Sequence, residues 1–287
     1  MSLDAPEISL VVVCYEMARE LPRTLQSLST PYQRGVDPGQ YEIVIVDNGS
    51  RSPPSLADFP DIVPRTTIIS CSRKTTSPVP AINEGLTVAR GKLIGVWIDG
   101  ARMASPGLLR SCLEASRLHS RPIIATLNYQ LGPARQAISA DLGYDVAAED
   151  ALLSDIGWFE NGYRLFDIAT PEIAEPTAPM LESNALFLPR ALWDELGGYD
   201  EAFTSKGGGM ANPDIFIRAV GLPAAQLIRI AGEGTFHQIH GGLTTAGLKP
   251  TLDYVKEASR EYRAIRGRAL APIRAPGWLY RSPEAER

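Results

Sequence analysis

The chain has 287 residues and a formal net charge of -5, with 44% hydrophobic and 21% charged residues. This composition is ordinary for a soluble globular protein and excludes collagen-like and disordered chains. The acidic balance also argues against nucleic-acid binding, which usually requires a strongly basic face. No run approaches the roughly 18 apolar residues of a membrane span, and the amino end lacks the pattern of a signal peptide, so we expect a cytoplasmic protein.

Two further composition features concern the cysteines and the carboxyl end. The three cysteines are scattered without metal-ligand spacing, so we expect them to act as small apolar residues in a reducing compartment. Residues 249–287 carry nine Lys or Arg against five Asp or Glu, a net charge of +4, while the rest of the chain carries -9. This asymmetry is typical of a solvated helix face, and it also fits peripheral contact with an anionic membrane surface.

Strands and helices alternate in the first 120 residues. Apolar, β-branched runs predict buried strands at residues 8–15, 41–46 and 66–71. Apolar residues at helical spacing predict helices at 17–29, 79–90 and 106–119. The run GKLIGVWIDG at 91–100 predicts a strand that is buried on both faces and stops at Asp99. This alternation predicts a mainly parallel, doubly wound α/β (Rossmann-like) sheet, which binds ligands at the carboxyl ends of its strands.

The second half of the chain is more irregular. Strands are predicted at residues 122–131, 184–188 and 226–237, and helices at 190–196, 213–220 and 251–266. In the last helix, Leu252, Val255, Ser259, Tyr262 and Ile265 share one face, so we expect that face to pack against the domain. A Pro- and Arg-containing tail follows this helix.

Four segments in order along the chain resemble glycosyltransferase family 2, whose members have the nucleotide-diphospho-sugar transferase fold called GT-A. They are residues 8–28, residues 42–50 (EIVIVDNGS), residues 83–99 and residues 196–203 (LGGYDEAF). The resemblance implies a hexosyltransferase-type enzyme, for example of polysaccharide biosynthesis. Such an enzyme moves a sugar from a nucleoside-diphosphate sugar to a hydroxyl of a glycan or other acceptor, with inversion at the anomeric carbon.

The resemblance also implies a division of the chain. We expect a GT-A domain over residues 1–248, with a nucleotide-binding half at 1–120 and an acceptor half at 121–248. The irregular stretch at 133–180 is interpreted as an acceptor-side insertion rather than a separate domain. Residues 249–287 are expected to form a carboxyl-terminal helix and tail.

Nucleotide-binding candidates follow from the same resemblance. Asp47 ends a predicted strand, where the family uses a carboxylate to accept a hydrogen bond from uracil, although Asp-Asn-Gly-Ser is also a good turn. Tyr15 follows the first strand and either stacks on the base or belongs to the core. Asn83 matches a phosphate or ribose contact, and Asp99 matches the first carboxylate of the family's Asp-x-Asp element.

The metal site departs from the family pattern, because Ala101 replaces the carboxylate that normally binds the cation directly. We expect Asp99, His237 and His240 to supply the donors for Mn²⁺ or Mg²⁺, imidazole favouring Mn²⁺. In an extended strand the two histidines would face opposite sides unless the chain turns, and a pair of structural histidines is the alternative.

The position of the family's catalytic base also differs in this sequence. The family places an Asp in a Glu-Asp-x-Asp segment, and here residues 211–214 read ANPD, so Asn212 stands where a base is expected. Asp214 is a candidate base, with a helix-start Asp as the alternative, and Asp200 is a second candidate. Glu182 and Glu201 also lie on the acceptor side. Without the carboxylates at 101 and 212, the sequence also fits a nucleotide-sugar-binding family member with weak or lost catalysis.

Overall fold

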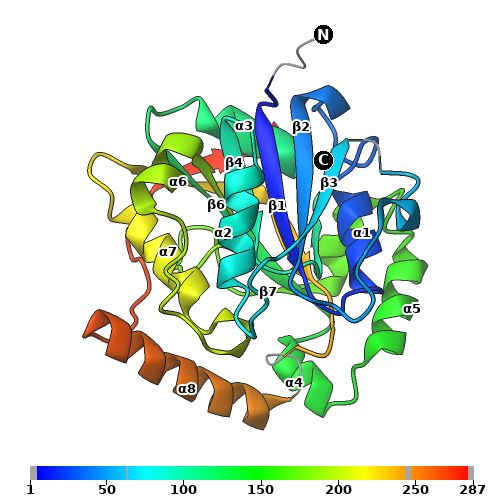
Figure 1. Ribbon diagram of the computed structural model, residues 1–287. Coiled ribbons are helices and arrows are strands. Elements are labelled where there is room, and N and C mark those ends of the chain that lie inside the picture. The colour runs from blue at the N-terminus through cyan, green and yellow to red at the C-terminus, as the bar shows by residue number, and fades with distance from the viewer. Residues whose placement is uncertain (1–4, 63, 243–246, 284–287) are drawn as a thin grey trace.

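The computed structural model describes residues 5–62, 64–242 and 247–283, and these form a layered α/β structure around one sheet (Figure 1). The strand order is β10-β9-β6-β8-β4-β1-β2-β3, with β5 paired to β9 and β7 paired to β6. Most neighbours run parallel, but β8 is antiparallel to both β4 and β6. The predicted mainly parallel α/β sheet is confirmed.

The first half of the chain forms the elements expected from its apolar runs. The strands are β1 (Ile8–Cys14), β2 (Tyr41–Asp47), β3 (Arg65–Ser70), β4 (Leu93–Trp97) and β5 (Arg102–Ala104). The helices are α1 (Glu20–Ser27), α2 (Val79–Val88) and α3 (Leu108–Ser116). Every residue of β1, β2 and β4 is buried, because helices cover both faces of the central strands.

The second half completes the sheet. Its strands are β6 (Pro122–Leu131), β7 (Ala169–Pro171), β8 (Ala185–Pro189), β9 (Gln226–His237) and β10 (Trp278–Arg281). Its helices are α4 (Gln136–Asp141), α5 (Val146–Ile156), α6 (Arg190–Leu196), α7 (Ala211–Val220) and α8 (Leu248–Arg266). The sequence did not predict β10, which pairs in parallel with β9 from within the tail.

Two hydrophobic clusters hold the layers together. Helices α2, α6 and α7 pack on one face of the sheet, and α1 and α3 pack on the other. Helix α2 approaches the sheet so closely that a Cβ at Gly85 would lie 2.4 Å from Val11 Cγ1. Gly197 and Gly198, with φ of 69° and 71°, adopt the left-handed conformation that ends α6. The close approach at Gly85 and the positive φ at Gly197 and Gly198 explain why residues 83–99 and 196–203 contain glycine at these positions.

The predicted packing of α8 is partly wrong. Ala258 and Tyr262 are buried against the domain, but Leu252 is 58% exposed and Val255 is 39% exposed. Apolar periodicity identifies a stripe on a helix, but it does not show whether a protein surface covers that stripe. As expected, the three cysteines are buried free thiols. Among the described residues, no helix is both long and apolar enough to cross a membrane.

Candidate functional site

The direction of β8 determines which side chains meet at the end of β4. Strand β4 ends at Trp97, which lies opposite Ala185 at the start of the antiparallel β8. The residues that follow β4 and the residues that precede β8 therefore lie at the same edge of the sheet. Asp99 belongs to the first group and Glu182 to the second, so the sheet brings these two carboxylates to one edge.

Asp99 is held by the turn into β5. Its carboxylate accepts hydrogen bonds from the Ala101 amide at 3.1 Å and from Arg102 Nε at 2.9 Å. Burial disfavours the charged form, but the Arg102 guanidinium and the Ala101 amide favour it, and the pKa of Asp99 is lowered to about 2. Asp99 is therefore an ionised oxygen donor at neutral pH.

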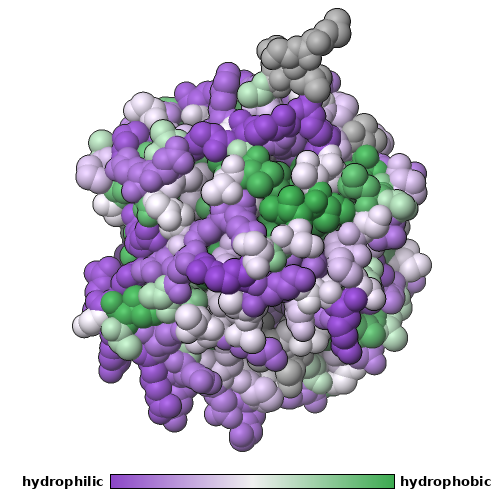
Figure 2. All heavy atoms as spheres, viewed as in Figure 1, coloured by the Kyte–Doolittle hydropathy of each residue, from purple (hydrophilic) through white to green (hydrophobic). Residues whose placement is uncertain are grey.

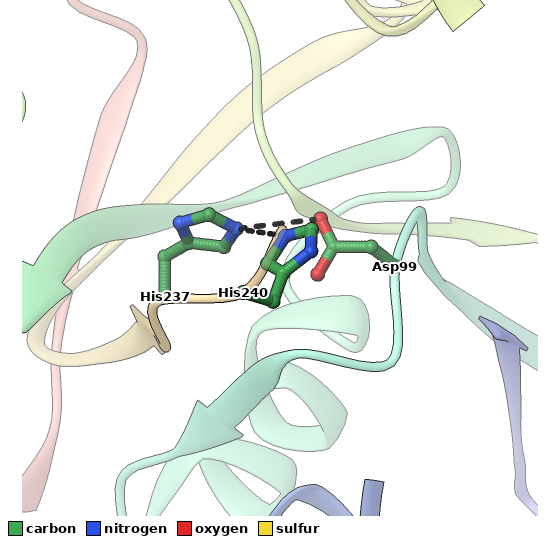
Figure 3. Close-up of side chains that lie close together, drawn as sticks. All are labelled: Asp99, His237 and His240. Carbon is green, nitrogen blue, oxygen red and sulfur yellow. Dashed lines mark hydrogen bonds and ion pairs between the residues drawn. The ribbon is translucent and has the colours of Figure 1, made fainter. Parts of the chain in front are cut away.

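His237 and His240 converge on Asp99 (Figure 3). Arg102 and His237 are register partners in β5 and β9. The Nε2 of His237 lies 4.0 Å from Asp99 Oδ2 and 3.2 Å from His240 Nε2. Strand β9 ends at His237, so the chain leaves the extended conformation before His240 and both rings reach one point. The alternation that would separate the two histidines applies only within a strand.

This donor set fits a divalent cation. One ligand atom from each of Asp99, His237 and His240 lies within 4.8 Å of the others. Burial and the neighbouring Arg102 lower the pKa of His237 well below its usual value, so its ring is neutral, as a metal ligand must be. A mixed imidazole and carboxylate set suits Mn²⁺ better than Mg²⁺, which prefers oxygen alone.

Gln136 orients the His237 ring, and sequence reasoning did not find it. Its Nε2 donates to the His237 carbonyl at 2.7 Å, so its Oε1 is the atom that lies 2.6 Å from His237 Nδ1. Nδ1 must then carry the proton, which leaves Nε2 as a lone pair facing Asp99 and His240. This is the arrangement by which a neighbouring amide fixes the tautomer of a metal-binding histidine.

Glu182 is held by Asn212, the residue that replaces the expected base. Asn212 Nδ2 donates to Glu182 Oε2 at 2.7 Å and to Asn184 Oδ1 at 2.9 Å. The Tyr199 hydroxyl donates to Asn212 Oδ1 at 3.0 Å, which fixes the orientation of the amide. The partners of Asn212 therefore aim its N–H group at a carboxylate from another segment.

The surroundings of Glu182 favour proton exchange near neutral pH. Burial and the nearby Glu172 carboxylate raise its pKa to about 7, while Asn212 and Arg102 act in the opposite direction and Asp99 adds to the increase. No guanidinium within the described residues forms an ion pair with Glu182. Carboxylates with such a raised pKa are typical of general acids and bases.

The two predicted bases lie in a different environment. Arg266 of α8 donates to Asp214 from Nε at 2.6 Å and from Nη2 at 2.7 Å. The same Nη2 contacts Asp200 Oδ2 at 2.6 Å. Asp214 is only 2% exposed. The structure thus brings Asp200 and Asp214 together on one guanidinium, and the catalytic role of either residue stays a prediction.

A comparison with known families identifies the segment that carries β1 to β4. The family model described as "Glycosyl transferase family 2" matches residues 9–125. This match covers fewer than half of the 287 residues. The match includes Asp99. Four other residues of the site lie beyond it: Glu182, Asn212, His237 and His240. No curated protein sequence matched the chain.

Solved structures resemble this chain in their fold. The chain is similar to S. aureus TarS 1-349, with a TM-score of 0.53 and 11% identity, over 90% of this chain and 65% of that one. The same fragment in complex with UDP gives a TM-score of 0.54 at 11% identity over the same 90% and 65%. Its complex with UDP-GlcNAc gives 0.53 at 10% identity, over 90% and 66%. The GT-A fold is confirmed, and the chain spans about two thirds of the TarS fragment.

Within the segment that the family model matches, Asp47 and Tyr15 lie at the carboxyl ends of adjacent strands. Asp47 is fully buried, and its two oxygens accept the amides of Gly49 and Ser50, each at 3.1 Å. Its turn-forming role is therefore present, and its contact with a base stays a prediction. Tyr15 is 55% exposed, which excludes the core interpretation and leaves its ring accessible for stacking.

Asn83 has a structural partner in the second half of the chain. Its Nδ2 donates to the Tyr199 carbonyl and its Oδ1 accepts the Tyr199 amide, both at 2.9 Å. Both ends of the side-chain amide thus hold the loop that follows Gly198. The nearby Arg73 forms an ion pair with Glu201 at 2.5 Å. A nucleotide contact from Asn83 stays a prediction.

Proposed function

We propose that this chain is a metal-assisted glycosyltransferase that moves a sugar from a nucleoside-diphosphate sugar to an acceptor hydroxyl with inversion. The observation that carries the proposal is the convergence of Asp99, His237 and His240 at the edge where the family 2 strands end. In open α/β sheets this edge is where ligands bind. The donor would lie along residues 1–120 and the acceptor along residues 121–248.

The proposed donor site combines a cation with fixed protein groups. A divalent cation held by Asp99, His237 and His240 would neutralise the charge that develops on the leaving diphosphate. Arg102, which contacts Asp99, provides a second positive charge beside the diphosphate. Tyr15 and Asp47 would bind the base. Since TarS 1-349 was solved with UDP and with UDP-GlcNAc, uridine nucleotides are the first donors to test.

We assign the role of general base to Glu182 rather than to Asp214 or Asp200. Its carboxylate takes the proton from the acceptor hydroxyl as the hydroxyl oxygen forms a bond to the anomeric carbon. The bond from that carbon to the diphosphate oxygen breaks, and the diphosphate leaves with the electron pair. Inversion requires attack on the face opposite the leaving group, so the base and the cation act on opposite sides of the sugar. Asn212 positions the base and does not itself accept the proton.

The experiment is an assay of nucleotide release. The protein is incubated with UDP-, GDP- and dTDP-linked sugars and an acceptor panel, with Mn²⁺, Mg²⁺ or a chelator. We expect release with one nucleotide class, loss of release with the chelator, and a product of inverted anomeric configuration by NMR. Asp99→Asn is the matched variant, because it keeps the side-chain size and removes the charged donor.

The alternative is a nucleotide-sugar-binding protein with weak or lost catalysis, and Ala101 and Asn212 favour it. It predicts that nucleotide sugars bind, measured by calorimetry, while no acceptor in the panel supports nucleotide release. That outcome would contradict the enzyme proposal and leave the binding site intact.

A further inference from the structure

Helix α8 exposes an apolar stripe near its amino end. Leu248, Leu252 and Val255 are 43%, 58% and 39% exposed. Their spacing of four and three residues places them within about 60° of one another around the helix. Three large apolar side chains along one line of an exposed helix are unusual on a monomeric surface unless the surface binds something.

Helix α4 extends this stripe. Asp141 at the end of α4 accepts the Leu248 amide at 3.0 Å, which holds the start of α8 beside α4. Ile138 of α4 and Leu142, which directly follows α4, are 43% and 78% exposed. Figure 1 shows the two helices side by side along the lower margin of the molecule. We call Ile138, Leu142, Leu248, Leu252 and Val255 together the α4–α8 surface.

Basic residues border the α4–α8 surface. Lys249, Lys256 and Arg260 are exposed and lie along one line of α8, about a quarter turn from the apolar stripe. Asp253 pairs with Lys249, Oδ2 to Nζ at 3.0 Å, and offsets its charge, so Lys256 and Arg260 carry the positive charge of this row. Glu257 lies further around the helix. Figure 2 shows hydrophilic side chains projecting along the lower edge, where α8 runs in Figure 1. Apolar side chains beside a basic row are the pattern of a helix that lies in the interface of an anionic membrane.

Other side chains of α8 contact α7 and the segment that precedes it. Gly209 donates its amide to the Tyr254 hydroxyl at 3.0 Å, and Ser205 donates its amide to Glu261 Oε1 at 2.9 Å. Arg266 holds Asp214 of α7, the helix that also presents Asn212. Helix α8 thus exposes apolar and basic side chains while others of its side chains bind residues between 205 and 214.

We propose that the α4–α8 surface docks on an anionic lipid bilayer, with its apolar side chains inserted between headgroups and its basic row contacting lipid phosphates. A second copy of the chain fits less well. A symmetric dimer through this surface would bring the two basic rows close to each other, and like charges repel. An anionic bilayer neutralises the same row. This binding is independent of the proposed glycosyl transfer and is testable without a sugar donor.

The test is vesicle co-sedimentation of the full chain. Phosphatidylcholine vesicles are compared with vesicles in which a third of the lipid is phosphatidylglycerol, at low and high salt. The first variant is Leu252→Ser with Val255→Ser, and the second is Lys256→Glu with Arg260→Glu. Val88→Ser is the matched control, because Val88 is 38% exposed on α2. Since all five positions are exposed, unchanged melting temperatures check that the variants fold.

We expect binding to the anionic vesicles that weakens with salt, and a loss of about tenfold or more in each double variant. The Val88→Ser control should bind like the unchanged protein. Absence of binding to anionic vesicles, or equal binding by the Leu252→Ser and Val255→Ser variant, would overturn the proposal. A dimer in analytical ultracentrifugation that this variant abolishes would also overturn it, and would assign the surface to a second copy of the chain.

Discussion

Two side chains in the first turn of α7 belong to two different hydrogen-bonded groups. Asn212 binds the carboxylate of Glu182, and Asp214 is itself a carboxylate that binds Arg266. Asn212 donates to Glu182 through a neutral amide, whereas Asp214 receives two bonds from the Arg266 guanidinium. The amide leaves Glu182 with a pKa raised to about 7 by burial and by Glu172. Arg266, after the Ala202 amide, helps to lower the pKa of Asp200.

This difference separates a catalytic environment from a structural one. A base must take up a proton and release it again, so its pKa has to lie near the working pH. The Asp214 carboxylate is bonded to Arg266 and joins α7 to α8 instead. The charge of the partner therefore matters more than the position of the carboxylate in a family-like segment.

The largest effect should come from Glu182→Gln. Glutamine keeps the size and a hydrogen-bonding group but cannot accept the acceptor proton, so kcat should fall about 10²–10⁴-fold. Donor affinity and melting temperature should change little. Glu201→Gln is the matched control, because Glu201 pairs with Arg73 at the surface. A kcat within a few-fold of the unchanged enzyme would remove Glu182 from the mechanism.

The pH dependence of activity provides a second test, on the unchanged enzyme and on Glu182→Gln. Because the base must be ionised and its pKa is raised to about 7, activity should rise with pH up to that value and level off above it. Below pH 7 the rate should fall about tenfold for each unit. Residual activity of Glu182→Gln should lack this acidic limb.

Asp214→Asn should affect stability rather than chemistry. It leaves Arg266 without two charged hydrogen bonds, and the free energy of unfolding should fall by about 2 kcal/mol. This lies below the loss for a fully buried pair, because the Arg266 side chain is 24% exposed. Urea denaturation measures the loss, and kcat per folded molecule should stay unchanged. A large fall in kcat at unchanged stability would restore Asp214 as the base.

A smaller effect is expected for Gln136→Leu. Removing the acceptor of the His237 Nδ1 proton frees the ring to rotate, and Mn²⁺ affinity should fall about tenfold. Calorimetric titration with Mn²⁺ measures this change. Gln136→Glu keeps an acceptor for the proton and should restore most of the affinity. If both variants bound Mn²⁺ as tightly as the unchanged protein, Gln136 would not position the ring.

The sequence predicted the first 120 residues better than the rest of the chain for physical reasons. Strands buried on both faces are continuous apolar runs, so β1, β2 and β4 and the position of Asp99 could be predicted. Glu182 could not be placed, because its position depends on the antiparallel direction of β8, which a five-residue strand does not reveal. The Arg266 pairing was equally hidden, since it joins residues 52 apart in the chain.

Two further features of the structure were not predicted from the sequence. The end of β9 at His237 was predicted correctly, but the convergence of His237 and His240 depends on the direction that the chain takes after this strand, which the sequence did not reveal. The exposure of Leu252 and Val255 was not predicted, because an apolar stripe can be recognised in the sequence, whereas the surface that would cover it cannot.

The most direct test of the account is the melting temperature of the protein with UDP, GDP or dTDP, with and without Mn²⁺. A ligand that binds the native state raises the melting temperature. We expect one nucleotide to give a shift of a few degrees that requires Mn²⁺, and His237→Ala to lose the Mn²⁺ requirement together with most of the shift. A His237→Ala protein that keeps the full Mn²⁺-dependent shift would contradict the assignment of Asp99, His237 and His240 as the cation site.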